Sequence, residues 1–425
     1  MGRRLGSARS LALDISPLRE SPAYRALWLG QIVSLIGTNM RYVAVPWHVF
    51  QLTGSTVAVG FIGLAEVVPL IVFSIIGGAV ADRVNRRALI ARMQIGLMAS
   101  SLALAAVALV DRPPLILIYA LTASASAFAA FDRPARSAMV PSLVAPGKLP
   151  AAMALRQVVF QVTQIIGPAI GGALIFAFSV AWVYTLDAVT FVAALVALRW
   201  VPSLPPAEIT EASGMESVRE GLRFSFRNPV ILSSLVIDLV AMIFGMPRAV
   251  FPALAERTFD LGAAGLGLLY AAPAAGALLG ALTTGWVGRV RRQGAAVLIA
   301  VTAWGAFITG AGLALFSLPL TLLLLALAGA SDVISAVFRG TIVQEATPDA
   351  LRGRVSAVNI MVVTGGPRIG DFEAGLVAGA FGAPASIVIG GAACLAGTAV
   401  VAAAFPSLRT YEVDLTASPR EREHH

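Results

Sequence analysis

Residues 78–87 read Gly-Ala-Val-Ala-Asp-Arg-Val-Asn-Arg-Arg; they end one long apolar run, 56–81, and lead into another, 88–110. Each run is long enough for a helix to cross a hydrocarbon core about 30 Å thick. Between them the glycine permits close helix contact, and the acid can hold an arginine or a helix N-terminus by charge-assisted bonds. The stretch therefore predicts a tight, charged turn that joins two membrane helices.

Similar apolar runs continue in both directions from this turn. We expect twelve membrane-spanning helices, at 27–50, 56–81, 88–110, 114–138, 154–177, 180–200, 230–254, 263–288, 294–316, 319–341, 355–380 and 383–405. With 58% hydrophobic and 13% charged residues, the chain has more apolar side chain than a soluble core of its length could enclose. The sequence thus predicts an all-α membrane protein.

The basic residues predict the orientation of these helices. With both termini placed in the cytoplasm, 26 of the 31 Lys and Arg fall on cytoplasmic segments, as the positive-inside rule requires. The formal charge of +8 is spread between apolar runs and is not gathered on one face, so nucleic acid is not an expected partner. We expect a multi-pass protein of the inner (plasma) membrane, with the lipid bilayer as its solvent.

One long connection divides the chain into two sets of six helices. It opens with several prolines, turns acidic, and then alternates Arg219, Arg223 and Arg227 with apolar residues, which predicts an amphipathic helix on the cytoplasmic membrane surface. No apolar stretch typical of a cleavable signal precedes Trp28. The expected organisation is a cytosolic arm (1–24), a six-helix bundle (25–200), a linker (201–229), a second bundle (230–406) and a cytosolic tail (407–425).

The two halves share a repeated segment. Gly-Pro-Ala-Ile-Gly at 167–171 matches Gly-Pro-Arg-Ile-Gly at 366–370, in the fifth and eleventh predicted helices. Gly-rich helices can match by chance, but the equivalent placement favours duplication. Two six-helix halves related as parallel repeats are the architecture of a transporter that rocks around a central site.

The turn at 78–87 has the form G-x-x-x-D-R-x-x-R-R, which resembles motif A of the major facilitator superfamily. The resemblance implies the major facilitator fold, with two pseudo-symmetric six-helix bundles. It also assigns a gating role to the motif residues Gly78, Asp82, Arg83, Arg86 and Arg87. An ordinary positive-inside loop would explain the arginines but neither the acid nor the glycine. The matching turn of the second half, 285–292, keeps arginines and lacks the acid, so we expect a weaker latch there.

The fifth helix carries a second motif. Gly167, Pro168, Gly171 and Gly172 resemble motif C, which this superfamily associates with antiporters that export. Small residues permit tight packing, and proline removes a backbone hydrogen bond and favours a bend. Generic packing of small residues is the alternative interpretation.

Nearly the whole chain resembles the subgroup of enterobactin exporters and macrolide-efflux proteins. The residues that carry this resemblance are motif A, Ser-Pro-Ala-Tyr-Arg at 21–25, Phe-Pro-Ala-Leu-Ala at 251–255, and Thr-Pro-x-x-x-Arg-Gly-Arg at 347–354. The resemblance implies export of a siderophore or hydrophobic drug in exchange for protons, by a monomer. An importer or facilitator of the same fold is the alternative.

Several charged residues lie within predicted helices and are not features of the subgroup motifs. A charge at the bilayer centre costs roughly 2.5–3.5 kcal/mol on insertion scales, so each should face a partner, a cavity or water. We expect Arg41 to pair with Glu66, and Asp371 to lie on the same helical face as Arg368, with Glu373 on another side. These residues are candidates for the coupling and substrate cavity, and structural ion pairs are the alternative.

Further charges lie closer to the helix ends. Asp132, Arg133 and Arg136 end the fourth helix, where we expect motif A to be their gating partner, with a solvated helix end as the alternative. Asp187, Asp238 and Asp332 are intramembrane acids for which structural pairing is favoured, and Asp332 is also a second-rank candidate for coupling.

Other chemistry finds little support in the sequence. The chain has no G-x-x-x-x-G-K-[ST] motif that would indicate ATP binding. One cysteine, Cys394, and three histidines, of which only His48 is internal, predict no metal site and no cofactor. A membrane enzyme would show a converging nucleophile, base or metal set, and a receptor would need neither doubled halves nor motif A. The expected protein is not an enzyme, and its partners are a small-molecule substrate and protons.

Overall fold

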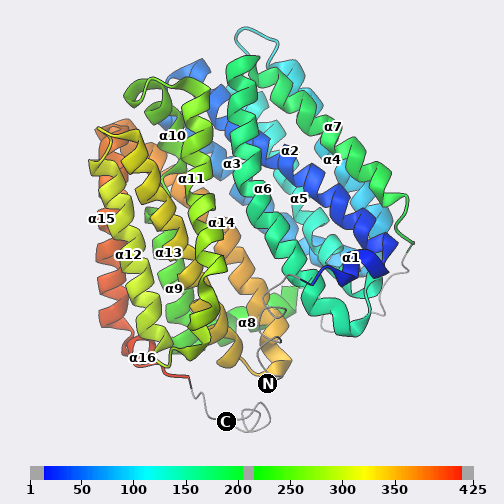
Figure 1. The fold of residues 1–425 in the computed structure, drawn as a ribbon, viewed down its shortest axis with the longest axis vertical. Coiled ribbons are helices and arrows are strands. Elements are labelled where there is room, and N and C mark those ends of the chain that lie inside the picture. The colour runs from blue at the N-terminus through cyan, green and yellow to red at the C-terminus, as the bar shows by residue number, and fades with distance from the viewer. Residues whose placement is uncertain (1–13, 204–214, 414–425) are drawn as a thin grey trace, which may run out of the picture.

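The computed structural model describes residues 14–203 and 215–413, which within those ranges form helices and no strands (Figure 1). Predictions that concern residues 1–13, 204–214 and 414–425 lie outside the described residues. The first half of the chain forms α1 (Ser16–Glu20), α2 (Pro22–Thr53), α3 (Thr56–Arg83), α4 (Arg86–Val107), α5 (Leu115–Leu143), the 3-10 turn η1 (Pro146–Lys148), α6 (Leu149–Ala177) and α7 (Val180–Leu198).

The second half follows the linker helix α8 (Met215–Arg227). It comprises α9 (Pro229–Phe244), η2 (Arg248–Val250), α10 (Phe251–Ala253), η3 (Leu254–Thr258), α11 (Gly262–Leu282), η4 (Thr284–Arg289), α12 (Gln293–Leu313), α13 (Leu318–Glu345), η5 (Asp349–Leu351), α14 (Arg352–Phe381), α15 (Ala383–Ala404) and α16 (Pro406–Arg409). Helices are thus found at all twelve predicted spans, and the all-helical membrane fold is confirmed.

Ten helices of the described residues are long and apolar enough to cross a membrane. The two long spans outside that set, α2 and α14, carry internal charges, namely Arg41 in α2 and Arg368, Asp371 and Glu373 in α14. Both helices also reach across to the other half of the molecule, since α2 contacts α10 and α11, and α14 contacts α3. Their polarity therefore marks helices that line the interior.

Side-chain caps fix where several helices begin. The hydroxyl of Ser21 accepts a hydrogen bond from the backbone of α2, that of Ser55 does so for α3, and the side chains of Asn85 and Asn228 do so for α4 and α9. Each cap satisfies one of the backbone N–H groups that a helix start leaves unpaired. At the end of α2, Gly54 has φ +62°, a left-handed conformation that glycine adopts without strain.

The seventh predicted span is not one continuous helix. Helix α9 ends at Phe244, and the chain resumes in short 3-10, α and π turns from Arg248 to Thr258. Pro247 disfavours a helical conformation of the residue before it, and the Trp304 indole donates a hydrogen bond of 3.0 Å to the Gly245 carbonyl. The eighth span is also corrected, since α11 ends at Leu282 and its last predicted residues form the 3-10 turn η4.

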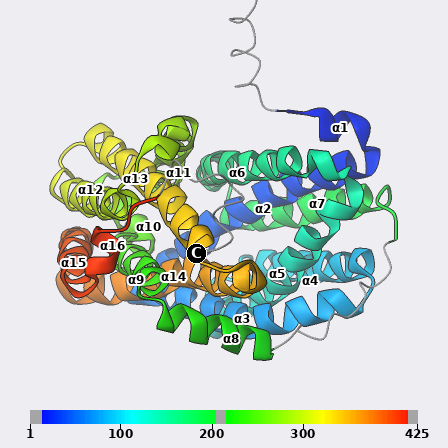
Figure 2. The same cartoon turned by 90° about the horizontal axis from the view of Figure 1, so that it is seen from below.

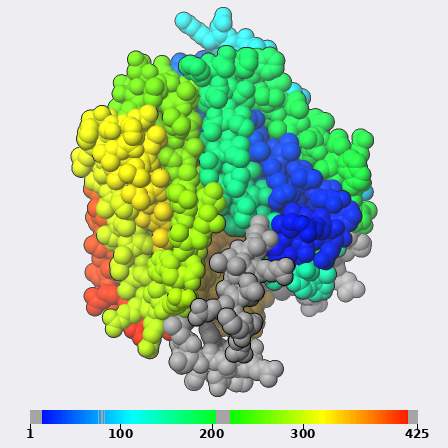
Figure 3. All heavy atoms as spheres, in the orientation of Figure 1, coloured from blue at the N-terminus to red at the C-terminus, as the bar shows by residue number. Residues whose placement is uncertain are grey.

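Two bundles, α2 to α7 and α9 to α15, lie side by side and meet along two helix pairs, α3 with α14 and α6 with α11 (Figures 1 and 2). We call the face that carries α1, α8 and α16 the linker face, at the bottom of Figure 1, and the other the opposite face. Close contacts occur near the opposite face: a Cβ on Gly375 would lie 2.8 Å from the Gly60 Cα, and one on Gly172 would lie 2.9 Å from the Gly267 Cα. In Figure 3 the surfaces of α6 and α11 meet in the upper part of the molecule, with a hollow between the halves below. The halves are therefore closed together toward the opposite face.

The linker contains the helix α8, which lies on the linker face and packs against α9 and α14. Arg354 of α14 forms an ion pair with Glu220 of α8, and Ser225 is buried. Phe226 is 67% exposed and Leu222 lies one turn before it, so the helix presents an apolar strip to its surroundings. This helix attaches the linker to the second bundle.

Candidate functional site: charged groups inside the two bundles

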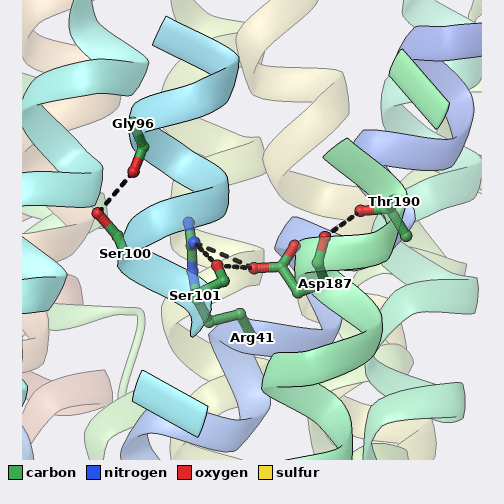
Figure 4. Close-up of polar contacts among 6 residues, drawn as sticks. All are labelled: Arg41, Gly96, Ser100, Ser101, Asp187 and Thr190. Atoms are coloured by element: carbon green, nitrogen blue, oxygen red, sulfur yellow. Dashed lines mark hydrogen bonds and ion pairs between the residues drawn. The ribbon is translucent and has the colours of Figure 1, made fainter. Parts of the chain in front are cut away.

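A buried ion pair ties three helices of the first bundle together (Figure 4). Arg41 of α2 lies 3.0 Å from the carboxylate of Asp187 of α7, which is fully buried. The hydroxyl of Ser101 of α4 donates to that carboxylate at 2.6 Å and accepts from Arg41 at 2.9 Å. The predicted pairing of Arg41 with Glu66 is therefore wrong, because α2 packs chiefly against α6 and α7. Arg41 has a structural partner within its own bundle.

The second bundle contains a comparable group. Arg339 of α13 lies 2.6 Å from the carboxylate of Asp238 of α9, and both side chains are buried. Arg339 also donates to Ser335 at 2.6 Å and lies 4.0 Å from Asp332. In each bundle an internal arginine thus joins the first helix to a later one, as expected for charges that must be paired away from water.

A third ion pair crosses between the bundles. Glu66 of α3 lies 2.9 Å from Nε of Arg368 of α14, and both side chains are mostly buried. Arg368 also donates to the Tyr42 hydroxyl of α2 at 2.8 Å and to the Thr364 carbonyl at 2.7 Å. The guanidinium of the second bundle is therefore held by an acid and a phenol of the first.

Asp371, one turn after Arg368, has a looser partner. Its carboxylate lies 3.9 Å from Nε of Arg248, the first residue after the break in the seventh span. As expected, Asp371 lies on the same face of α14 as Arg368 and within its electrostatic reach, although the ion pair of Arg368 is with Glu66. Tyr270 of α11 donates a hydrogen bond of 3.3 Å to the Arg248 carbonyl and lies within electrostatic reach of Asp371 and Glu66. We call Tyr42, Glu66, Arg248, Tyr270, Arg368 and Asp371 the central cluster.

Glu373 does not belong to the central cluster. It is partly buried, and no ion pair of it is found within residues 14–203 and 215–413. Its neighbour Phe372 packs edge-on against Phe61 of α3, with ring centroids 5.2 Å apart. The expectation that Glu373 faces another side of the helix from Arg368 and Asp371 agrees with this arrangement.

Motif A forms the turn between α3 and α4. Arg86 donates to the Ala138 carbonyl of α5 at 3.0 Å, and Arg87 donates to the Arg199 carbonyl after α7 at 3.5 Å, while Arg83 is exposed. Gly78 and Asp82 belong to α3, but their side chains lie outside the described residues. Two arginines of the motif thus hold the ends of neighbouring helices in the same bundle.

The charged end of α5 pairs within its own bundle. The Asp132 carboxylate accepts from Arg136 at 2.6 Å and from Gln94 of α4 at 3.1 Å. The prediction that motif A is the partner of Asp132 is therefore wrong, because the acid is already occupied, while motif A reaches α5 through the Ala138 carbonyl. Arg133 is exposed.

The motif C residues lie where α6 contacts two other helices. A Cβ on Gly167 would lie 2.3 Å from the Asn39 Cβ, and one on Gly171 would lie 3.1 Å from the Met40 Cα, both in α2. Gly172 faces α11 instead, and Pro168 lies inside the helix. Close approach of three helices explains why these positions have small side chains.

The second copy of the repeat is placed in the same way. A Cβ on Gly370 of α14 would lie 2.4 Å from the Met242 carbonyl oxygen of α9, as Gly171 of α6 faces α2. Helix α14 then contacts α3, as α6 contacts α11. The repeated segment in the sequence therefore corresponds to an equivalent position in each bundle.

Among the arginines and tyrosines of these groups, sequence reasoning missed four: Tyr42, Arg248, Tyr270 and Arg339. Arg248 carried a signal, since it follows Gly-Met-Pro at 245–247, a break inside an apolar span. Arg339 lay near a predicted helix end and was counted with the cytoplasmic charges. Tyr42 had no signal, because a tyrosine in an apolar helix is ordinary.

The chain is similar to a family model and to curated proteins over most of its length. The model described as transmembrane secretion effector matches residues 12–424. Enterobactin exporters (EntS) of Escherichia coli O1:K1 and of Shigella boydii serotype 18 are 32% identical over 356 residues, covering 82% of this chain and 84% of each relative.

Solved structures show the same fold at low sequence identity. A single-residue mutant of the nucleoside transporter NupG superposes with a TM-score of 0.75 at 13% identity, covering 91% of this chain and 99% of that one. A POT family transporter in complex with 5-aminolevulinic acid gives 0.74 at 11% identity, covering 91% and 97%. These similarities concern the architecture of the two bundles.

Proposed function

This chain belongs to the transmembrane secretion effector family of the major facilitator superfamily, and from that premise we propose that it exports a small organic molecule from the cytoplasm in exchange for protons. As a family member it is a multi-pass secondary transporter and not an enzyme. The similarity to enterobactin exporters supports a siderophore or a hydrophobic drug as the substrate. We propose that the monomer is the working unit.

Alternating access by rocking of the bundles 25–200 and 230–406 is the proposed transport mechanism. The contacts that support it lie near the opposite face, where small residues let α3 meet α14 and α6 meet α11. On the positive-inside rule we propose that the linker face is cytoplasmic. A protein closed at the opposite face and hollow below it (Figure 3) is then ready to receive substrate from the cytoplasm.

The ion pair of Glu66 with Arg368 is the observation that carries the proposed coupling. It joins α3 to α14, one of the two most extensive helix pairs between the halves. Protonation of Glu66 would remove its charge and leave Arg368 without a counter-ion in the first bundle. A group that titrates and also holds two moving bodies together can link proton binding to the conformational equilibrium.

Asp371 is the second proposed coupling acid. Because it is 3.9 Å from Arg248 and shares the central cluster with Glu66, a change of charge at either acid alters the field at the other. Exchange of substrate for protons requires such an interaction, since each ligand must bias the state that binds the other. We place Glu373 and Asp332 behind these two acids.

Motif A is proposed to act as a latch on the linker face. Arg86 and Arg87 bind carbonyl groups at the ends of α5 and α7, which holds the turn in one position. In this proposal Asp82 contributes the charged contact that stabilises one transport state, and Arg83 and Arg133 supply positive charge on the same face. Motif C supports export as the direction of transport.

Efflux measurements test the proposal. Cells or inside-out vesicles that contain the protein should move members of a panel of catechol siderophores and hydrophobic dyes out of the cytoplasmic side, and a proton uncoupler should stop them. Accumulation on the cytoplasmic side instead would indicate an importer.

Single substitutions then test the coupling acids. Glu66→Gln or Asp371→Asn should abolish proton-driven efflux while substrate binding is retained and becomes insensitive to pH. Asp111→Asn, which removes an exposed acid from the loop between α4 and α5, is the matched control. If both coupling variants still concentrate substrate in a pH gradient, this assignment is wrong.

A further inference from the structure

Arg248 differs from Arg41, Arg339 and Arg368, which form the three ion pairs described first. Its side chain is 32% exposed, whereas those of Arg41, Arg339 and Arg368 are 12%, 7% and 13% exposed. Those three lie 2.6–3.0 Å from a carboxylate, but Arg248 is 3.9 Å from Asp371. Arg248 is therefore the least engaged arginine among these pairs.

Two polar atoms between Arg248 and Asp371 have no hydrogen-bond partner among the described residues. These are Nε of Arg248 and Oδ1 of Asp371, and both are buried. A guanidinium has five N–H donors and no acceptor, and buried donors without acceptors are costly. Arg248 and Asp371 thus attract each other by charge without a hydrogen bond between them. N–H donors of Arg248 and an acceptor oxygen of Asp371 are therefore available to a ligand.

The backbone fixes Arg248 in place. It is the first residue after the break in the seventh span, where Trp304 occupies the Gly245 carbonyl and Tyr270 donates to the carbonyl of Arg248 itself. The short turn η2 also contacts α3 and α14. Broken helices at the meeting of two repeats are where transporters of this architecture bind solutes. The position suits a binding residue better than a structural one.

We infer that Arg248 binds an acidic group of the transported molecule, a carboxylate or an ionised phenol, in competition with Asp371. This rests on the proposed function and adds the chemical class of the substrate. The planar guanidinium can hold such a group through two parallel N–H donors. When the substrate takes Arg248, Asp371 loses its counter-ion, so that substrate binding changes the electrostatic environment of this proposed coupling acid.

Binding of matched acids and esters tests this inference. The protein in lipid nanodiscs is titrated with four aromatic carboxylic acids, 1-pyrenebutyric acid among them, and with their methyl esters, with empty nanodiscs as the blank. The wild type should bind at least one acid ~10-fold more tightly than its ester, the scale of a charge-assisted hydrogen bond. Arg248→Gln should remove this preference and leave ester binding unchanged.

Two further variants complete the test. Asp371→Asn should tighten acid binding, because it removes the competing carboxylate, and Arg112→Gln, an exposed arginine on the α4–α5 loop, should change nothing. If Arg248→Gln does not fold, Arg248→Lys decides, since it keeps the charge and loses the planar fork. That variant should weaken acid binding and leave the ester unaffected.

Equal binding of every acid and its ester by the wild type overturns the inference, as does a preference that survives the loss of Arg248. The proposed function fails in a different way, through absence of gradient-driven movement of every compound tested. A protein that transports yet binds acid and ester equally would refute only the role of Arg248.

Discussion

Replacing Glu66 by Gln should shift the two halves away from the state closed at the opposite face. The substitution nearly preserves shape but removes the charge that faces Arg368 of the other bundle at 2.9 Å. At that distance two unit charges attract by about 6 kcal/mol for an effective dielectric constant near 20. Desolvation offsets most of this, and hydrogen bonds to charged groups are worth about 1.5–3 kcal/mol net.

The geometry selects the lower end of that range. The Nε–H of Arg368 is not directed at the carboxylate, although the atoms are close. A loss of about 1.5–2 kcal/mol changes the ratio of the two states by roughly 10- to 30-fold. Arg368 keeps Tyr42 and the Thr364 carbonyl, so the protein should still fold.

Distances between spin labels would measure this shift. Cys394 is the single cysteine of the chain and is buried, so its replacement gives a background free of native thiols. Labels at Gln51 and Thr258, positions near the opposite face in different bundles, should report a longer distance in Glu66→Gln than in the wild type. An unchanged distance distribution would refute the reasoning, and Asp111→Asn should behave as the wild type.

Three other substitutions have defined outcomes. Asp187→Asn leaves Arg41 buried without a charged partner and should lower the free energy of unfolding by about 3–5 kcal/mol. Denaturation in detergent measures this loss. Joint replacement of Asp187 and Arg41 by apolar residues should recover part of it. Gly172→Val places side-chain atoms where a Cβ alone would lie 2.6 Å from the Ala263 carbonyl oxygen, so it should hold the halves apart at the opposite face and stop efflux at normal expression. Asp82→Asn should reduce transport without loss of folded protein, and normal efflux at normal expression would reject the latch.

The helices and their order could be predicted from the sequence because the thickness of the bilayer sets the length of apolar run that a spanning helix needs. Caps such as Ser55 and Asn85 and the left-handed Gly54 lie at the predicted turns. The break at 245–247 was missed, although Gly and Pro were visible, because hydrophobicity continues through it and the run was long enough for one helix.

The pairing of charges could not be predicted in the same way. The depth of Arg41 and Glu66 in consecutive helices follows from the sequence, but the direction in which each side chain points does not. Helix α2 turns Arg41 toward α7, and α3 turns Glu66 toward the second bundle, and both directions depend on contacts between distant segments. Depth is set by local hydrophobicity, whereas partners are set by the packing of the whole molecule.

The two copies of the repeat differ at the places that matter for coupling. In the alignment of 167–171 with 366–370, Ala169 corresponds to Arg368. The residues that directly follow the two segments, Gly172 and Asp371, correspond to each other. Helix α6 therefore meets α11 through small side chains, while α14 brings a cation and an acid to its contact with α3. One proton can break a charged contact but not a contact between glycines. On the proposed function we therefore assign coupling to the α3–α14 contact and treat the α6–α11 contact as the surface on which the halves pivot.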